Sequence, residues 1–214
     1  MAIFRMFKNS ALELKNLRCL TVTAMLIALN LALKSVTIYI TDDMKISFSF
    51  LALAAIGMLF GPTVGFMAGT VTDILGMLIA QNIGAFNPLF TLVEATGAML
   101  YGLFLYKLTP IRLSKDGFKN VTADKNMLFS FLRVIGAKLS VAIVCNIIMN
   151  PLFMVLLGYW GWETAVMVKL PARLLKNAIQ CPVDIILLLL VLFPVMVAYN
   201  SIFRQNTFHK TAEQ

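Results

Sequence analysis

The sequence predicts an all-α integral membrane protein with six transmembrane helices and both termini in the cytoplasm. The chain of 214 residues is 60% hydrophobic and has a mean hydropathy of +0.86, which is more apolar surface than a soluble domain of this size can bury. Its apolar residues form runs that reach the roughly 20 residues needed to cross a bilayer. Its lysines and arginines gather in three blocks outside those runs, as expected of cytoplasmic segments.

The apolar runs give the boundaries of the six spans. The first span runs from Leu17 to about Ile40. The second run, Ile46 to Gln81, is too long for one crossing, and the helix-breaking pair Gly61-Pro62 in its middle predicts a hairpin of two short spans. The fourth, fifth and sixth spans are predicted over residues 87–108, 127–157 and 166–198.

The three basic blocks orient these spans in the lipid bilayer. Even numbers of spans, four and two, separate the blocks, so all three segments fit in the cytoplasm of a multi-pass cell-membrane protein. The same blocks explain the formal charge of +8 better than nucleic-acid binding does. The chain therefore divides into a cytoplasmic N-terminal tail (1–16), a transmembrane domain (17–199) with a cytoplasmic loop at about 109–126, and a cytoplasmic tail (200–214).

The sequence contains no pattern that is typical of an enzyme. The single histidine, His209, lies in the polar C-terminal segment, so no histidine metal cluster or histidine-dependent triad is expected in the membrane. No nucleophile elbow, phosphate-binding loop or CxxC pair is present. We therefore expect no catalytic activity, no metal and no cofactor, which leaves a binder or a passive facilitator.

The sixth span carries a polar face. Its members recur at spacings of three and four residues, which places them on one side of a helix: Arg173, Lys176, Asn177, Gln180 and Asp184. Charged groups in a membrane cost about 2.5–3.5 kcal/mol each on insertion scales, so they normally face a cavity or the bundle interior. Similar faces on the third, fourth and fifth spans include Asp73, Glu94, Asn146 and Asn150. With the predicted orientation, these groups converge in the extracellular half of the bundle.

Two interpretations of these converging groups stay open. The groups either pair with one another or line a binding site. Arg173 and Lys176 favour a ligand with carboxylates, because two cations one turn apart need more negative charge than one helix neighbour supplies, and arginine binds carboxylates through two parallel bonds. Amides such as Asn146 both donate and accept hydrogen bonds, as the edge of a heterocycle requires.

Small residues mark where helices can approach closely. The glycines of Gly57-x-x-x-Gly61 and Gly65-x-x-x-Gly69 favour packing inside the bundle. An alanine stripe at every fourth position of the first span consists of Ala24, Ala28 and Ala32. This stripe either packs inside the bundle or contacts an external protein.

Several motifs resemble the substrate-binding S components of energy-coupling factor (ECF) vitamin transporters. These are Met-Lys-Ile-Ser-Phe-Ser-Phe at 44–50, Gly-Met-Leu-Phe-Gly-Pro-Thr-Val-Gly at 57–65 and Thr-Asp-Ile-Leu-Gly at 72–76. Three further motifs, at 84–91, 101–105 and 170–177, are similar to the folate-specific branch of that family. The similarity extends over most of residues 24–192.

The resemblance implies a six-helix subunit of the prokaryotic plasma membrane that captures a vitamin from outside. It also implies association with a transmembrane coupling subunit and two ATP-binding cassette ATPases. Ala24, Ala28 and Ala32 match the small-residue motif that packs on the coupling subunit in this family.

Folate, which the resemblance favours, combines a flat pterin with a glutamate tail that carries two carboxylates. We expect the tail near Arg173 and Lys176. Lys45 is a further candidate for the tail, although the family pattern predicts arginine there and lysine offers only a point charge. The expected pterin contacts are Asp73, Asn87, Asn146 and Asn150, with Phe86, Phe90 or Trp162 stacking on the ring.

Two alternatives remain. Within the family, the chain is an S component for another vitamin, such as pantothenate, riboflavin or a thiamine precursor. Neutral or cationic substrates leave Arg173 and Lys176 hard to explain. Outside the family, the chain is a stand-alone membrane facilitator or a membrane scaffold.

Overall fold

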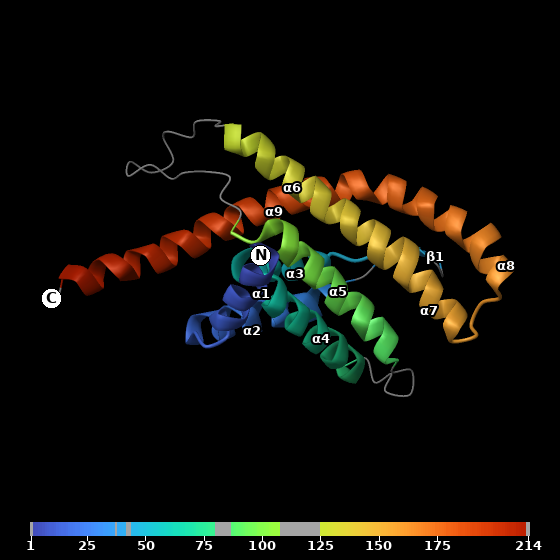
Figure 1. Cartoon of the computed structure of the whole chain (residues 1–214), viewed down its shortest axis with the longest axis horizontal. Helices are drawn as coiled ribbons and strands as arrows, with labels where there is room; N and C mark the ends of the chain where they lie inside the picture. Colours follow the sequence, from blue (N-terminus) through green and yellow to red (C-terminus); the bar gives the residue numbers. More distant parts are fainter. Residues whose placement is uncertain (1, 37, 42–43, 80–86, 108–124, 213–214) are drawn as a thin grey trace.

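The protein is a bundle of helices, described here from a computed structural model that covers residues 2–36, 38–41, 44–79, 87–107 and 125–212 (Figure 1). In chain order the elements are α1 (Ala2–Glu13), α2 (Leu17–Ser35), β1 (Ile38–Thr41), β2 (Met44–Ile46), α3 (Phe50–Phe60), α4 (Pro62–Ile79), α5 (Pro88–Leu105), α6 (Lys125–Val141), η3 (Ala142–Met149), α7 (Asn150–Leu156), α8 (Trp162–Thr164), η4 (Ala165–Lys169) and α9 (Leu170–Ala212). The segments η3 and η4 are π-helical. Figure 1 shows α6 and α7 as parts of one long rod and α9 running past the other helices to the C-terminus.

Five helices in the described part of the chain are long and apolar enough to cross a membrane. They cover Leu17–Ser35, Pro62–Ile79, Pro88–Leu105, Leu128–Leu156 and Trp162–Tyr199. The predicted second span differs, because α3 has only eleven residues and is roughly 16 Å long at 1.5 Å per residue. A bilayer core is about 30 Å thick, so α3 is shorter than a full crossing, and a short second span was predicted from the hairpin.

The short helix α3 forms the centre of the bundle. Nine of its eleven residues are buried, and Ala54, Ala55 and Ile56 have no exposed surface. One side of α3 joins a cluster with α5, α6 and α9, while the other side joins a cluster with α2 and α4. A helix that is apolar all round is expected to be enclosed on every side.

The predicted hairpin at Gly61-Pro62 is present, and glycines allow its two helices, α3 and α4, to pack closely against α5. Gly61 has a φ of +91°, a conformation that favours glycine. A Cβ on Gly57 would lie 2.6 Å from the backbone nitrogen of Gly102 in α5, and one on Gly102 would lie 2.6 Å from Pro62. The glycines therefore pack inside the bundle, where only small residues let the backbones approach this closely.

Residues 1–16 were predicted as a tail, but Ala2–Glu13 form helix α1 and pack on α4. The fully buried Ser10 hydroxyl donates to the Phe60 carbonyl (2.7 Å) and accepts from the backbone N–H groups of Thr63 (3.1 Å) and Val64 (3.2 Å). Those two N–H groups have no intrahelical partner at the start of a helix. Gly61 has no side chain to cap α4, so Ser10 supplies the cap from another helix.

The bundle is all-α as predicted, and the described residues add one short two-stranded hairpin to it. Residues predicted as the end of the first span and the following loop form β1 and β2, which pair antiparallel with Ile38 opposite Ile46 and Tyr39 opposite Lys45. This segment is rich in β-branched and aromatic residues, which favour strands. The predicted cytoplasmic loop at 109–126 lies almost entirely outside the described residues, and α9 continues as a helix through most of the predicted C-terminal tail.

Gly102→Ala should destabilise the protein by about 1–3 kcal/mol, because the added methyl group meets the Pro62 backbone and overpacks the junction of α3, α4 and α5. The control is Gly136→Ala in α6, whose added Cβ would lie 3.5 Å from the Phe104 ring, an ordinary contact. That variant should be neutral or gain up to about 1 kcal/mol of helix stability. Thermal unfolding in detergent measures both, and equal effects of the two variants would contradict the proposed packing constraint.

Candidate functional site

A cavity of about 760 Å³ opens at the end of the bundle opposite the Gly61-Pro62 turn. Its walls come from the C-terminal ends of α2 and α4, the middle of α5, and the middle of the α6–η3 rod. The ends of α2 and α4 that line the cavity are those that the sequence analysis assigned to the extracellular side. Cavities of 300–1,000 Å³ are typical of sites for small-molecule ligands.

The cavity exists because α3 begins late. Ser47, Ser49 and Phe50, at the start of α3, line its inner end. The fully buried Asn30 of α2 donates from Nδ2 to the Ser49 carbonyl at 2.7 Å and fixes this entry point. The space that a full-length span would fill is therefore left for a ligand.

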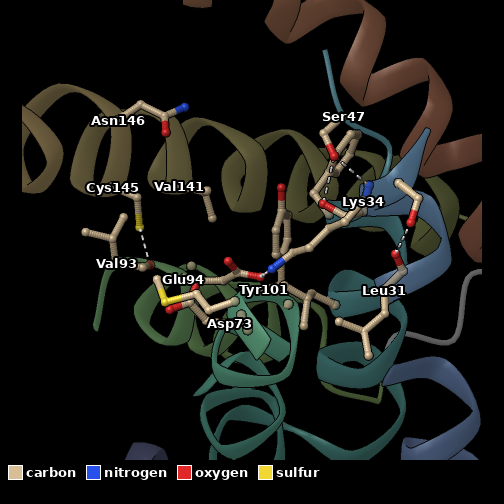
Figure 2. Close-up of a pocket in the computed structure, with 18 of the residues that line it drawn as sticks. Leu31, Lys34, Ser47, Asp73, Val93, Glu94, Tyr101, Val141, Cys145 and Asn146 are labelled. Carbon is tan, nitrogen blue, oxygen red and sulfur yellow. Dashed lines mark hydrogen bonds and ion pairs between the residues drawn. The ribbon is translucent and has the colours of Figure 1, made fainter. Parts of the chain in front are cut away.

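An ion pair crosses the cavity from α2 to α5 (Figure 2). The Lys34 ammonium lies 2.6 Å from the Glu94 carboxylate, and both side chains are about one quarter exposed (27% and 23%). Lys34 also donates to the Thr72 carbonyl at 3.5 Å, and the Thr72 hydroxyl lies 3.3 Å from Glu94. The Lys34 ammonium is thus held between α4 and α5.

A second carboxylate lies beside Glu94. Asp73 of α4 interacts electrostatically with Glu94 and accepts a 2.6 Å hydrogen bond from the Thr91 hydroxyl. Both carboxylates line the cavity. This wall therefore combines two negative groups with one lysine, and it suits a ligand edge that donates hydrogen bonds.

A more deeply buried ion pair borders the cavity on the other side. Lys138 of α6 lies 2.7 Å from Asp184 of α9, with side-chain exposures of 9% and 3%, and the ammonium lies 4.4 Å from the centre of the Phe50 ring. Tyr101 also lines the cavity and is 2% exposed. Its hydroxyl has no hydrogen-bond partner within the described part of the chain, which is unusual for a buried polar group.

The π-helical segment η3 brings Asn146 to the cavity wall. Asn146 donates from Nδ2 to the Asn177 side chain at 2.9 Å, and its carbonyl accepts from Arg173 at 3.4 Å. The Arg173 guanidinium also stacks on Trp160 at 5.1 Å. Short π-helical insertions occur frequently at functional sites, and this one connects the polar face of α9 to the cavity.

The ten predicted ligand residues are only partly brought together. Asp73 and Asn146 line the cavity, and Arg173 contacts it through Asn146. Lys176 lies half-buried one turn along α9. Asn87 caps α5 by accepting from the Leu89 N–H at 3.1 Å.

The other predicted ligand residues do not line the cavity or are not among the residues that the structure describes. Asn150 is not in the cavity lining, and its buried Oδ1 has no partner among the described residues. Phe90 is half-buried, while Trp162 is 65% exposed. Lys45 lies on β2, but its side chain and the whole of Phe86 fall outside the described residues.

The sequence analysis missed Lys34, Lys138 and Tyr101 as members of the cavity wall. A signal existed for Lys34, because it is a lone charge near the end of an apolar span. The mutual pairing of polar groups, one of the two open interpretations, applies to Lys138 with Asp184 and to Lys34 with Glu94. Trp160, which the sequence analysis did not name, stacks on Arg173.

Comparisons with known proteins point to one family. The family described as "ECF transporter, substrate-specific component" matches residues 18–192. A folate transporter FolT from Clostridium novyi is 32% identical over 148 residues, 69% of this chain and 72% of that protein. A folate transporter FolT from Leuconostoc mesenteroides is 27% identical over 164 residues, 76% of this chain and 77% of that protein. A crystal structure of FolT bound with folic acid is 30% identical, covers 81% of this chain and 91% of its own, and has a TM-score of 0.62.

Lys138→Met should destabilise the protein by about 3–5 kcal/mol, because it leaves the buried Asp184 carboxylate without its partner. The double variant Lys138→Met/Asp184→Leu removes both charges and should recover most of that loss. Lys34→Met breaks the more exposed pair and should change stability by about 1 kcal/mol or less. Unfolding in detergent compares the three variants, and a double variant no more stable than Lys138→Met would contradict this account.

Proposed function

Because the chain belongs to the family of ECF transporter substrate-specific components, we propose that it is the folate-binding subunit of such a transporter. The family comprises transporter components and is not an enzyme family. Relatives named as folate transporters, and a similar structure that holds folic acid, support folate as the substrate. In this proposal the protein spans the prokaryotic cell membrane, has both termini in the cytoplasm and counts the short α3 as the second of its six helices.

The cavity is the observation that carries this proposal. Its volume of about 760 Å³ suits a ligand of the size of folate. It lies at the bundle end that the basic blocks place outside, where a vitamin is captured. Its wall mixes carboxylates, an amide and aromatic rings, which are the groups that bind a pterin.

We assign the pterin to the part of the cavity between Asp73 and Asn146. The amino group and ring N–H of a pterin donate hydrogen bonds, which a carboxylate accepts, and the Asn146 amide both donates and accepts. Asn87 and Asn150 remain proposed contacts to the pterin edge, although neither is among the residues that line the cavity. For stacking on the pterin ring, Phe50 in the cavity wall joins the proposed candidates Phe86, Phe90 and Trp162.

We assign the glutamate tail to the neighbourhood of Arg173, with Lys176 and Lys45 as further cations. Within the cavity itself, the lysines at 34 and 138 already lie beside carboxylates. Arg173 borders the cavity through Asn146 and is oriented by Trp160. A guanidinium held in place in this way is suited to bind a carboxylate through two parallel hydrogen bonds.

The alanine stripe is the proposed docking surface for the transmembrane coupling subunit, which works with two ATP-binding cassette ATPases. Ala24, Ala28 and Ala32 are all exposed on α2, so they are not used for packing within the described bundle. Small side chains let a partner helix approach closely in a membrane.

Arg173→Gln should weaken the binding of folic acid by roughly tenfold or more, because a charge-assisted hydrogen bond contributes about 1.5–3 kcal/mol. Binding of pteroic acid, which lacks the glutamate tail, should not change. Titration calorimetry with the purified protein in nanodiscs measures both affinities. Lys8→Gln in α1, at the opposite end of the bundle, is the control and should bind both compounds as the wild type does.

The same assay with the wild-type protein tests whether the chain is a folate-binding subunit. It should bind folic acid tightly in the presence of excess riboflavin, pantothenate or thiamine, and proteoliposomes containing only this subunit should not take folic acid up rapidly. Competition by another vitamin would reassign the substrate within the family. Rapid uptake by the isolated subunit would instead support a stand-alone facilitator.

Ala28→Trp should abolish assembly with the coupling subunit while folic acid still binds, because the indole fills the flat stripe without touching the cavity. Ile186→Trp, at a position on α9 that is 63% exposed, introduces the same ring elsewhere on the membrane-facing surface and should assemble normally. Co-purification with the coupling subunit and the ATPases measures assembly. Normal assembly of Ala28→Trp would refute the docking role of the stripe.

A further inference from the structure

We propose that Glu94, together with Asp73 and Tyr101, forms an inner subsite for the hydrogen-bond-donating edge of the ligand's heterocycle, and that the Lys34 ammonium occupies this subsite while the cavity is empty. The inference deepens the proposed function and rests on it. It adds Glu94 and Tyr101 as binding residues and gives Lys34 the role of a positioning residue.

The geometry around Glu94 is that of a site already filled by a donor. The Lys34 ammonium lies 2.6 Å from Glu94 and 3.5 Å from the Thr72 carbonyl, so one nitrogen donates to acceptors on two helices. The amino group and adjacent ring N–H of a pterin present donors of the same kind along one flat edge. A ligand edge that takes the Glu94 oxygen now bound by Lys34 displaces the ammonium from that oxygen.

The acceptors of this wall suit a ligand edge. Asp73 and Glu94 are neighbouring carboxylates, and the Lys34 ammonium lies between the helices that carry them. Asp73 is oriented by the Thr91 hydroxyl at 2.6 Å. Each carboxylate accepts through two oxygens, so the pair offers more acceptor positions than the Lys34 ammonium and the Thr91 hydroxyl use, and the N–H groups of a ligand edge fit the remaining ones.

Tyr101 supplies an independent indication of a ligand. Its hydroxyl is buried and without a hydrogen-bond partner in the described part of the chain, although the residue lines the cavity. Buried polar groups of folded proteins nearly always have a partner. A polar ligand in the cavity would provide the missing one.

Displacement of the Lys34 ammonium would also affect α2, the proposed docking helix, because Lys34 belongs to it. Only Cys19 and Asn30 of α2 are buried, so few buried contacts hold this helix in place. Lys34 lies in its last turn and connects it to α4 and α5. Ligand binding would loosen this end of α2, which carries the exposed alanines on another face.

The affinity test uses the full-length protein in nanodiscs with folic acid and pteroic acid. Glu94→Gln should weaken the binding of both compounds at least tenfold, in contrast to Arg173→Gln, which affects folic acid alone. Tyr101→Phe should weaken both severalfold without loss of folding, because it removes a hydroxyl that has no partner among the described residues. Glu163→Gln, an exposed carboxylate in α8, is the control and should bind as the wild type does.

The variant Lys34→Met tests whether the ammonium only occupies the subsite until a ligand binds or forms an ion pair that the structure of the site needs. It should leave the affinity for pteroic acid unchanged or raise it, because the ligand no longer competes with the ammonium. Hydrogen exchange in the last turn of α2 (residues 31–35) should speed up when folic acid binds the wild type, and it should not respond to folic acid in Lys34→Met.

Three outcomes overturn the inference. If Glu94→Gln and Tyr101→Phe both bind pteroic acid as tightly as the wild type does, the proposed subsite is refuted. A loss of affinity in Lys34→Met as large as that in Glu94→Gln makes the ion pair structural. If the wild type binds neither compound, the proposed function fails first and this assignment fails with it.

Discussion

The close packing of a short helix between two long ones is the constraint on which the rest of the structure depends. Gly57 and Gly102 bring the backbones of α3 and α5 together, and the turn at Gly61 returns the chain at once into α4. Because α3 begins only at Phe50, this packing leaves one half of the bundle centre unfilled. The cavity occupies that unfilled part, so the same feature that makes α3 short creates the cavity.

Charge compensation decides what the cavity can hold. An apolar bundle in lipid tolerates charges only when they are paired or face a polar space, and both arrangements occur here. Lys138 and Asp184 form a buried pair that belongs to the bundle core. Lys34 and Glu94 form a more exposed pair that belongs to the cavity wall. The two pairs differ in exposure, and we propose exchange with a ligand only for the more exposed pair.

Helix α2 connects the two proposed activities of the protein, ligand capture and partner docking. Its last turn reaches into the cavity through Lys34, while Ala24 and Ala28 lie exposed on another face. Few of its side chains are buried, so a change at one end is not absorbed by extensive packing. The N-terminal helix α1 is held in place instead, because the Ser10 hydroxyl forms hydrogen bonds with the backbone of the α3–α4 turn.

The sequence by itself determined the membrane class, the approximate spans, the hairpin at Gly61-Pro62 and the family, because hydrophobic run length, helix-breaking pairs and motifs are local properties. It also identified Asp73 and Asn146 correctly as cavity residues. Only the tertiary structure decided which charges pair, since Lys34 and Glu94 are 60 positions apart on helices whose rotation no local pattern fixes. The π-helical turn in η3 shows the same limit: steps of four residues predicted that Asn146 and Asn150 share a face, but the widened turn keeps Asn146 in the cavity wall and leaves Asn150 outside it.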